Sequence, residues 1–139
     1  MKRGQTEPEK APQQVVQDFY TWIFQIGVPA PWTDVIMQQR GVLYPNLWSL
    51  LREHALKNDL DFEPFLDSDG AAVGFKVTET QIKGETAMIS VTVAGAKRNR
   101  LLVIELHHAV AEWRISNVYY QWAQVEDLLS LLKRKAYSN

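Results

Sequence analysis

His108, Asn117 and Tyr119 are the polar side chains of this sequence whose spacing is best suited to chemistry. They lie in two segments in which apolar and polar residues alternate, on either side of a predicted two-residue turn at 111–112. That turn would place all three on one apolar sheet face, with His108 diagonal to Asn117 and within side-chain reach. Polar groups that converge on an apolar cavity are typical of a small-molecule site. We therefore treat these three residues as candidate ligand-binding residues.

A structural interpretation of the same residues needs no ligand. In that interpretation His108 is a core histidine that is hydrogen-bonded to Asn117 or to a backbone carbonyl. The prediction also depends on the register of the two strands, because a shift of one residue would turn all three side chains outward. The sequence leaves both interpretations open.

Aromatic and acidic residues elsewhere could complete the predicted cavity. Tyr20 and Trp22 lie in the first predicted helix and Trp48 in the second, and all three are candidate aromatic walls. Asp34 lies in a loop that could cover the mouth of the cavity. It is the candidate for general acid–base chemistry, and all four are included as candidate ligand-binding residues.

Other kinds of catalytic or metal site lack their signatures. The chain has no cysteine, no nucleophile elbow around a serine, and no phosphate-binding glycine loop. His107 and His108 are neighbours on a strand, so they point to opposite faces, and His54 has no second histidine four residues away. We assign no catalytic residue, no metal ligand and no cofactor. Whether the protein is an enzyme stays undecided, and these missing signatures favour a non-catalytic role.

The segment 59–70 is acidic and contains aromatic residues. Its carboxylates could bind calcium, but the spacing matches only a fragment of the EF-hand pattern. A solvated connecting loop is the better interpretation, in which Phe62, Phe65 and Leu66 pack onto the core.

Hydrophobic periodicity predicts one α+β domain. Residues 1–11 read as a disordered polar tail and residues 12–139 as a single folded domain. Apolar residues at helical spacing predict a long helix over 12–26, a second over 46–58 that is capped by Asn46, and a short one over 124–135. A further short helix is expected near 34–39.

Between the second and third predicted helices the period changes to two. Four strands from about residue 72 to residue 120 are separated by turns at 83–85, 97–100 and 111–112. The predicted fold is a curved four-stranded antiparallel meander packed on the long N-terminal helix and the second helix, with a short C-terminal helix.

Composition restricts the class of partner. The 139 residues carry a net charge of −1 and no apolar run long enough to span a bilayer. Neither nucleic acid nor a membrane is therefore expected as the main partner, since both reward clustered positive charge. The first ten residues hold no apolar signal segment.

The order of elements resembles the nuclear-transport-factor-2-like (cystatin-like α+β cone) superfamily, and within it the bacterial domain-of-unknown-function 3828 branch. The matching segments are 15–22, 61–69 and 113–120. The resemblance implies a curved sheet closing on the first helix, often with a pocket, and frequent homodimers. Members of this branch commonly carry a secretion or lipoprotein signal. Localisation is therefore open, with a secreted, periplasmic or lipoprotein mature domain implied if a leader has been removed.

Together these observations favour a non-catalytic binding module with a pocket for a small apolar ligand on the concave face of the sheet. It is expected to be a homodimer through the outer face of the sheet. Two alternatives remain. One is a small enzyme that performs general acid–base chemistry in the same cavity, and the other is a protein–protein interaction domain whose interior is filled by its own aromatic residues.

Overall fold

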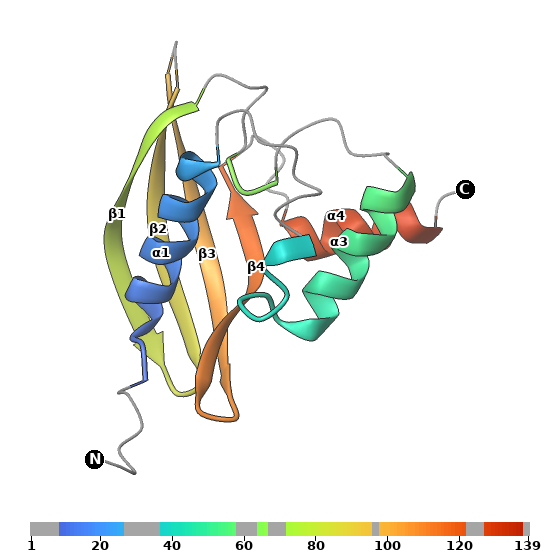
Figure 1. The fold of residues 1–139 in the computed structure, drawn as a ribbon, viewed down its shortest axis with the longest axis horizontal. Helices are drawn as coiled ribbons and strands as arrows, with labels where there is room; N and C mark the ends of the chain where they lie inside the picture. Colours follow the sequence, from blue (N-terminus) through green and yellow to red (C-terminus); the bar gives the residue numbers. More distant parts are fainter. Residues whose placement is uncertain are drawn as a thin grey trace.

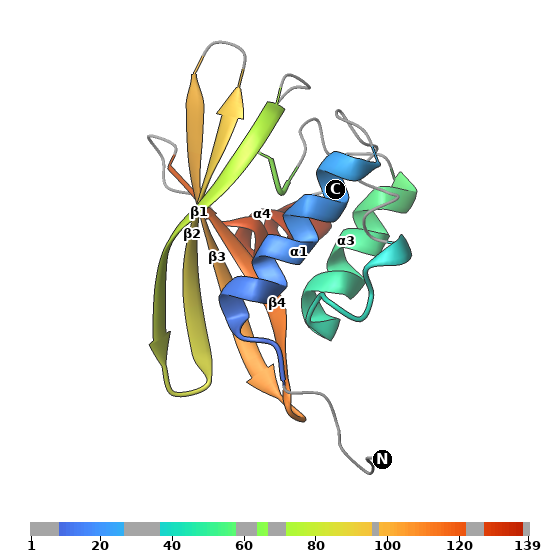
Figure 2. The same cartoon turned by 60° about the vertical axis from the view of Figure 1, so that its left-hand side comes forward.

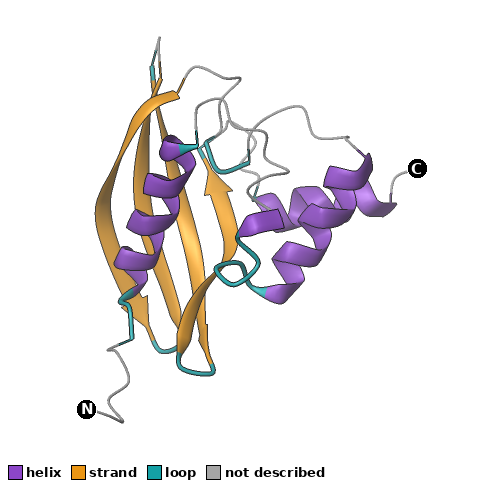
Figure 3. Ribbon diagram, viewed as in Figure 1, coloured by secondary structure: helices purple, strands orange, loops and turns teal. Residues whose placement is uncertain are grey.

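Four consecutive strands form one antiparallel sheet in the order β1-β2-β3-β4, with helices beside it (Figure 1). The computed structural model describes residues 9–26, 37–57, 64–66, 72–95, 98–121 and 127–137. The elements in these ranges are α1 (Pro12–Gln25), α3 (Pro45–Lys57), β1 (Ala72–Lys83), β2 (Thr86–Gly95), β3 (Asn99–Ala109), β4 (Glu112–Tyr120) and α4 (Leu128–Tyr137). The predicted α+β fold, with its curved meander sheet, is confirmed (Figure 3).

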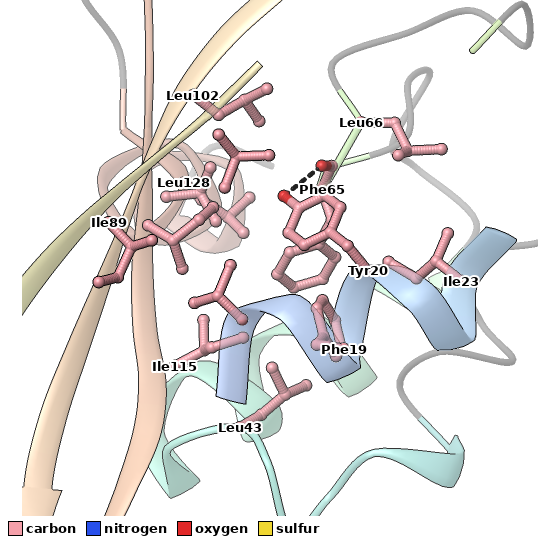
Figure 4. Close-up of a cluster of buried hydrophobic side chains, with 14 of the residues drawn as sticks. Phe19, Tyr20, Ile23, Leu43, Phe65, Leu66, Ile89, Leu102, Ile115 and Leu128 are labelled. Atoms are coloured by element: carbon pink, nitrogen blue, oxygen red, sulfur yellow. Dashed lines mark hydrogen bonds between the residues drawn. The ribbon is translucent and has the colours of Figure 1, made fainter. Parts of the chain in front are cut away.

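The core lies between the sheet and α1, which crosses one face of the strands in Figure 2. Alternate residues of the two central strands are buried on this face: Ala87, Ile89, Val91, Val93, Leu102, Ile104 and Leu106. The buried stripe of α1 consists of Val16, Phe19, Tyr20 and Ile23 (Figure 4). Burying each large apolar side chain contributes roughly 1.5–3 kcal/mol, so this layer fixes the position of α1 on the sheet.

The segment 64–66 is held in the core by two buried tyrosines. The Tyr20 hydroxyl donates a hydrogen bond of 2.6 Å to the Phe65 carbonyl, drawn as a dashed line in Figure 4. The Tyr120 hydroxyl donates a second one of 2.6 Å to the Pro64 carbonyl. Phe65 and Leu66 are buried, as the sequence predicts. Phe62 and the carboxylates on either side of this segment lie outside the described residues.

The outer edge of β4 is covered by other parts of the chain. The backbone N–H of Tyr44 donates to the Ile115 carbonyl at 2.7 Å, and the Ile115 N–H donates to the Val42 carbonyl at 2.8 Å. Further along, Tyr119 forms a bridge with Asp127. These contacts hold the segment before α3 and the start of α4 against the last strand.

Two helix starts differ from the prediction. Helix α3 begins at Pro45, so Asn46 lies inside the helix and is not its cap. Proline suits a first helical turn because its missing N–H has no intrahelical partner there. Helix α4 begins at Leu128, later than the predicted residue 124. Asp127 Oδ2 accepts the Ser130 N–H at 3.1 Å, which is the geometry of a helix N-cap.

The turn between β3 and β4 lies one residue earlier than predicted, at Val110–Ala111. His108 therefore pairs with Trp113, where the predicted turn would have paired it with Ile115. A second difference is a bulge: Leu106 pairs with Ile115 but Glu105 pairs with Asn117, so Ser116 is an extra residue in β4. The bulge changes the alternation along β4, so Asn117 and Tyr119 lie on the opposite face from Ile115, and each still shares a face with its own partner on β3.

Candidate functional site

A partly open cavity of about 550 Å³ lies beside the first half of α1. Three segments enclose it: the α1 residues around Asp18, the segment 39–42 that leads to α3, and the start of β4 at the β3–β4 hairpin. Glu9 and Lys10, just before α1, line it as well. The cavity therefore lies at the hairpin end of the helix–sheet layer, whereas the middle of the concave face is filled by the core.

The apolar lining of the cavity is largely aromatic. Val15, Phe19 and Trp22 project from one side of α1, because residues three and four positions apart lie on the same helix face. Trp113, near the start of β4, contributes a second indole. The centroid of its ring lies 4.9 Å from that of the His108 imidazole. Trp22 and Trp113 are both half-buried, so each keeps part of its surface available to a bound molecule.

Asp18 is the acidic residue that α1 contributes to the lining. Its Oδ2 accepts a hydrogen bond of 2.7 Å from the Lys10 ammonium, and its Oδ1 accepts one of 2.7 Å from the Gln14 amide. The hydrogen bond from Lys10 lowers the pKa of the Asp18 carboxyl below its ordinary value. The carboxylate is therefore charged at neutral pH and faces the cavity beside an aromatic wall.

His108 lies next to the cavity but does not line it. Its Nε2 lies 2.6 Å from Glu9 Oε1, and this pair and the contact with Trp113 connect it to two lining residues. His108 is on the same sheet face as Leu106 and is only partly buried. The expected hydrogen bond between His108 and Asn117 is wrong, because the bulge places Asn117 on the opposite face, and His108 contacts Glu9 instead.

Asn117 is a buried structural residue that joins β4 to α4. Its Oδ1 accepts the backbone N–H groups of Val118 and Leu129, each at 2.9 Å, and its Nδ2 donates to Asp127 Oδ2 at 2.9 Å. Burial raises the pKa of Asp127, but the hydrogen bonds from Asn117 and Ser130 outweigh it and hold that pKa below its ordinary value. Asn117 is not a lining residue of the cavity.

Tyr119 lies on the outer sheet face together with Glu105. Its hydroxyl is 3.4 Å from Glu105 Oε2, while the Ser116 hydroxyl donates to Glu105 Oε1 at 2.8 Å. Burial, and then the charge of Glu105, raises the pKa of the Tyr119 phenol. The three residues first proposed as one site are thus divided between the two faces of the sheet.

The remaining predicted site residues also lie in different parts of the structure. Trp22 lines the cavity, whereas Tyr20 is fully buried in the core. Trp48 lies on α3 with the guanidinium groups of Arg40 and Arg52 at 4.5 and 5.7 Å from its ring. Asp34 lies outside the described residues. Of the aromatic candidates, Trp22 alone is among the residues that line this cavity.

Several lining residues carried no recognisable signal in the sequence. Glu9 and Lys10 belong to the segment assigned to a polar tail, yet both make ion pairs here. Trp113 stood out as an aromatic residue, but its pairing with His108 depends on the position of the turn. That turn uses positive φ angles at Val110 and Ala111, which are uncommon for residues other than glycine and asparagine.

The described part of the chain holds neither a metal-binding cluster nor a membrane-spanning helix. Across those residues, no group of three or more His, Asp or Glu side chains is arranged to hold a metal ion. Within the same ranges, no helix has the length and apolar character needed to cross a membrane.

Comparisons with protein-family models, with curated proteins and with solved structures gave no match.

Proposed function

We propose that this chain is a non-catalytic binding module that holds a small apolar or aromatic ligand in the cavity beside α1. The observation that carries the proposal is that two half-buried indoles, Trp22 and Trp113, line one partly open cavity of about 550 Å³. Ligand pockets in proteins typically measure about 300–1,000 Å³ and combine apolar walls with a few polar groups. Asp18, Lys10 and Gln39 supply such groups here.

The experiment is a titration with neutral aromatic compounds such as tryptophol and indole, followed by calorimetry and by NMR of the tryptophan indole N–H signals. The expected result is saturable binding that shifts the signals of Trp22 and Trp113 and leaves that of Trp48 in place. Trp22→Ala should weaken binding by about tenfold or more, since a buried aromatic contact is lost.

Trp48→Ala is the matched control, because Trp48 is also a half-buried tryptophan on a helix but lies outside the cavity lining. It should bind the neutral compounds as the wild type does. The proposal fails if none of the compounds saturates the wild type, or if the two alanine variants bind equally well.

A second candidate function is a small enzyme that uses general acid–base chemistry. It is favoured by the contact between His108 Nε2 and Glu9 Oε1, because a carboxylate that orients an imidazole is a common arrangement for a general base. The imidazole does not line the cavity, so the binding function is the one we favour. Turnover of any bound compound that is abolished in His108→Ala would reverse this preference.

We also propose that the chain is a bacterial member of the nuclear-transport-factor-2-like superfamily and forms a homodimer through its outer sheet face. The helix-on-curved-sheet arrangement supports the first proposal. The second is supported by half-buried apolar residues that alternate with the core positions, namely Met88, Leu101 and Val103. Light scattering on wild type and Val103→Lys tests the dimer, which the charged residue should dissociate. A monomeric wild type contradicts it.

A further inference from the structure

We propose that the ligand of this cavity is an organic amine, with a protonated ammonium group that binds Asp18 and an aromatic body that packs on the indoles. This inference rests on the proposed binding function and adds the charge of the ligand to it.

The charged lining of the cavity is predominantly acidic. Among the described residues, three carboxylates, those of Glu9, Asp18 and Glu112, line it together with one ammonium, that of Lys10. Two of these carboxylates contact groups on strands: Glu9 Oε1 lies 2.6 Å from His108 Nε2, and Glu112 contacts the guanidinium of Arg114 at 2.9 Å. Asp18 is the carboxylate of this set whose cationic partner is another lining residue.

The contact between Lys10 and Asp18 shows what kind of group fits this position. A primary ammonium lies 2.7 Å from Asp18 Oδ2, while the Gln14 amide occupies the other oxygen and fixes the orientation of the carboxylate. Trp22 follows Asp18 by four residues, so its indole lies on the same side of α1. Asp18 and Trp22 both line the cavity, so the aromatic body of a ligand whose ammonium binds Asp18 has an indole to pack on.

Lys10 can be replaced at this position because its own ion pair is exposed. The side chains of Lys10 and Asp18 are 62% and 43% exposed. Pairs of this kind gain little from their Coulomb attraction, because water and salt screen it and the lysine side chain loses rotamer freedom. A ligand ammonium makes the same contact and brings an aromatic body that buries surface against Trp22 and Trp113. Lys10 therefore acts as an internal competitor for Asp18 and keeps its carboxylate charged.

The experiment compares three probes of similar shape: tryptamine, which is cationic, tryptophol, which is neutral, and indole-3-acetate, which is anionic. Their affinities are measured by calorimetry at neutral pH for wild type, Asp18→Asn and Lys10→Met. Glu79→Gln and Lys76→Met are the matched controls, since both residues are exposed on β1 and do not line the cavity.

On wild type, tryptamine should bind about tenfold more tightly than tryptophol, and indole-3-acetate should bind most weakly, because a charge-assisted hydrogen bond is made with the cation alone. Asp18→Asn should remove the preference for tryptamine, so that tryptamine and tryptophol bind this variant with similar affinity. Lys10→Met should increase the preference for tryptamine over tryptophol by a few-fold, since the competing ammonium is gone. The two control variants should behave as wild type.

The inference is overturned if tryptamine and tryptophol bind wild type equally, or if Asp18→Asn keeps the preference. In either case, tryptophol binding that depends on Trp22 would leave the proposed function intact. If none of the three probes binds, the proposed function fails together with the inference.

Discussion

Helix α1 carries two stripes of side chains that meet very different surroundings. The inner stripe, Val16, Tyr20 and Ile23, is fully buried against the sheet and the segment 64–66. The outer stripe, Val15, Asp18 and Trp22, lines the partly open cavity. Phe19 lies between them, because it is 2% exposed and still borders the cavity. One helix thus supplies both the closed core and one wall of the candidate site.

The difference shows what helical periodicity can and cannot distinguish. Tyr20 and Trp22 are both large aromatic residues, and both were predicted as walls of one pocket. They are two residues apart, and residues at that spacing on a helix do not share a face. The phenol of Tyr20 finds a buried carbonyl, whereas Trp22 keeps a partly exposed surface. Substitutions in the inner stripe should therefore lower stability, and substitutions in the outer stripe should weaken ligand binding.

The largest expected effect on stability comes from truncating an aromatic side chain of the inner stripe, and the same truncation in the outer stripe gives the comparison. Tyr20→Ala should lower the free energy of unfolding by about 3–5 kcal/mol, since it leaves a large hole in a close-packed core. Trp22→Ala should cost less than about half of that, because the indole is only partly buried and already borders a cavity. Urea denaturation followed by circular dichroism measures both values. Equal losses would mean that the two stripes are energetically alike.

A smaller change tests the hydrogen bond of the inner stripe. Tyr20→Phe should cost about 1–3 kcal/mol, because the Phe65 carbonyl then stays buried without its donor. Burial raises the pKa of the Tyr20 phenol far above its ordinary value of 10.0. The unfolded state therefore loses this proton at lower pH than the folded state does. Wild-type stability should fall as the pH rises above about 10.

Thermal unfolding between pH 8 and 11 measures this dependence. The Tyr20→Phe variant should show a shallower alkaline decline than wild type. An unchanged alkaline decline in the variant would contradict the assignment of this dependence to Tyr20.

A substitution at the tip of the β3–β4 hairpin should raise the free energy of unfolding, whereas the substitutions on α1 lower it. Val110 has a φ of 52° and is 94% exposed, so it bears backbone strain without a buried contact in return. Val110→Asn should raise the free energy of unfolding by about 1 kcal/mol, because asparagine tolerates this conformation in a two-residue turn. Chemical denaturation gives the value, and Val73→Asn, at an exposed strand position, is the control. A destabilised Val110→Asn protein would contradict the strain argument.

The smallest expected effect on stability is that of the outer-stripe carboxylate. The Lys10 ammonium lowers the pKa of Asp18, so the contribution of this carboxylate is present above about pH 3.8 and is lost as the pH falls below it. The pair is exposed, and Asp18→Asn should change the free energy of unfolding at pH 7 by less than about 1 kcal/mol. Denaturation curves at pH 7 and pH 3 measure this difference. A larger loss would assign Asp18 to the scaffold and not to the site.

The fold could be predicted from the sequence because its elements rest on long, regular patterns. Alternate apolar residues mark β2 and β3 throughout, and the central stripe of α1 recurs at helical spacing. The turn at Gly84 is also clear, since its φ of 63° suits glycine. Boundaries were less accurate where a proline or a capping aspartate, and not hydrophobicity, decides the first residue of a helix.

The site could be predicted only in part, because it depends on two local irregularities. Nothing in the residue types indicates that Val110 and Ala111 adopt positive φ angles, or that Ser116 forms a bulge. Together these move Trp113 beside His108 and place Asn117 and Tyr119 on the other face. The contact of Glu9 with His108 joins distant parts of the chain, and the ion pair of Lys10 with Asp18 joins the segment before α1 to the helix, so periodicity reveals neither of them.

The coverage of β4 also limits how the sheet can grow. Backbone groups of Val42 and Tyr44 occupy part of the edge of β4, and Asp127 occupies another part. Strand β1 is the other edge, and among the described residues it pairs with β2 alone. A foreign strand can therefore add along the full length of one side of the molecule only. Two copies joined through β1 would consume both free edges, so sheet extension would stop at a pair and would not continue into a fibre.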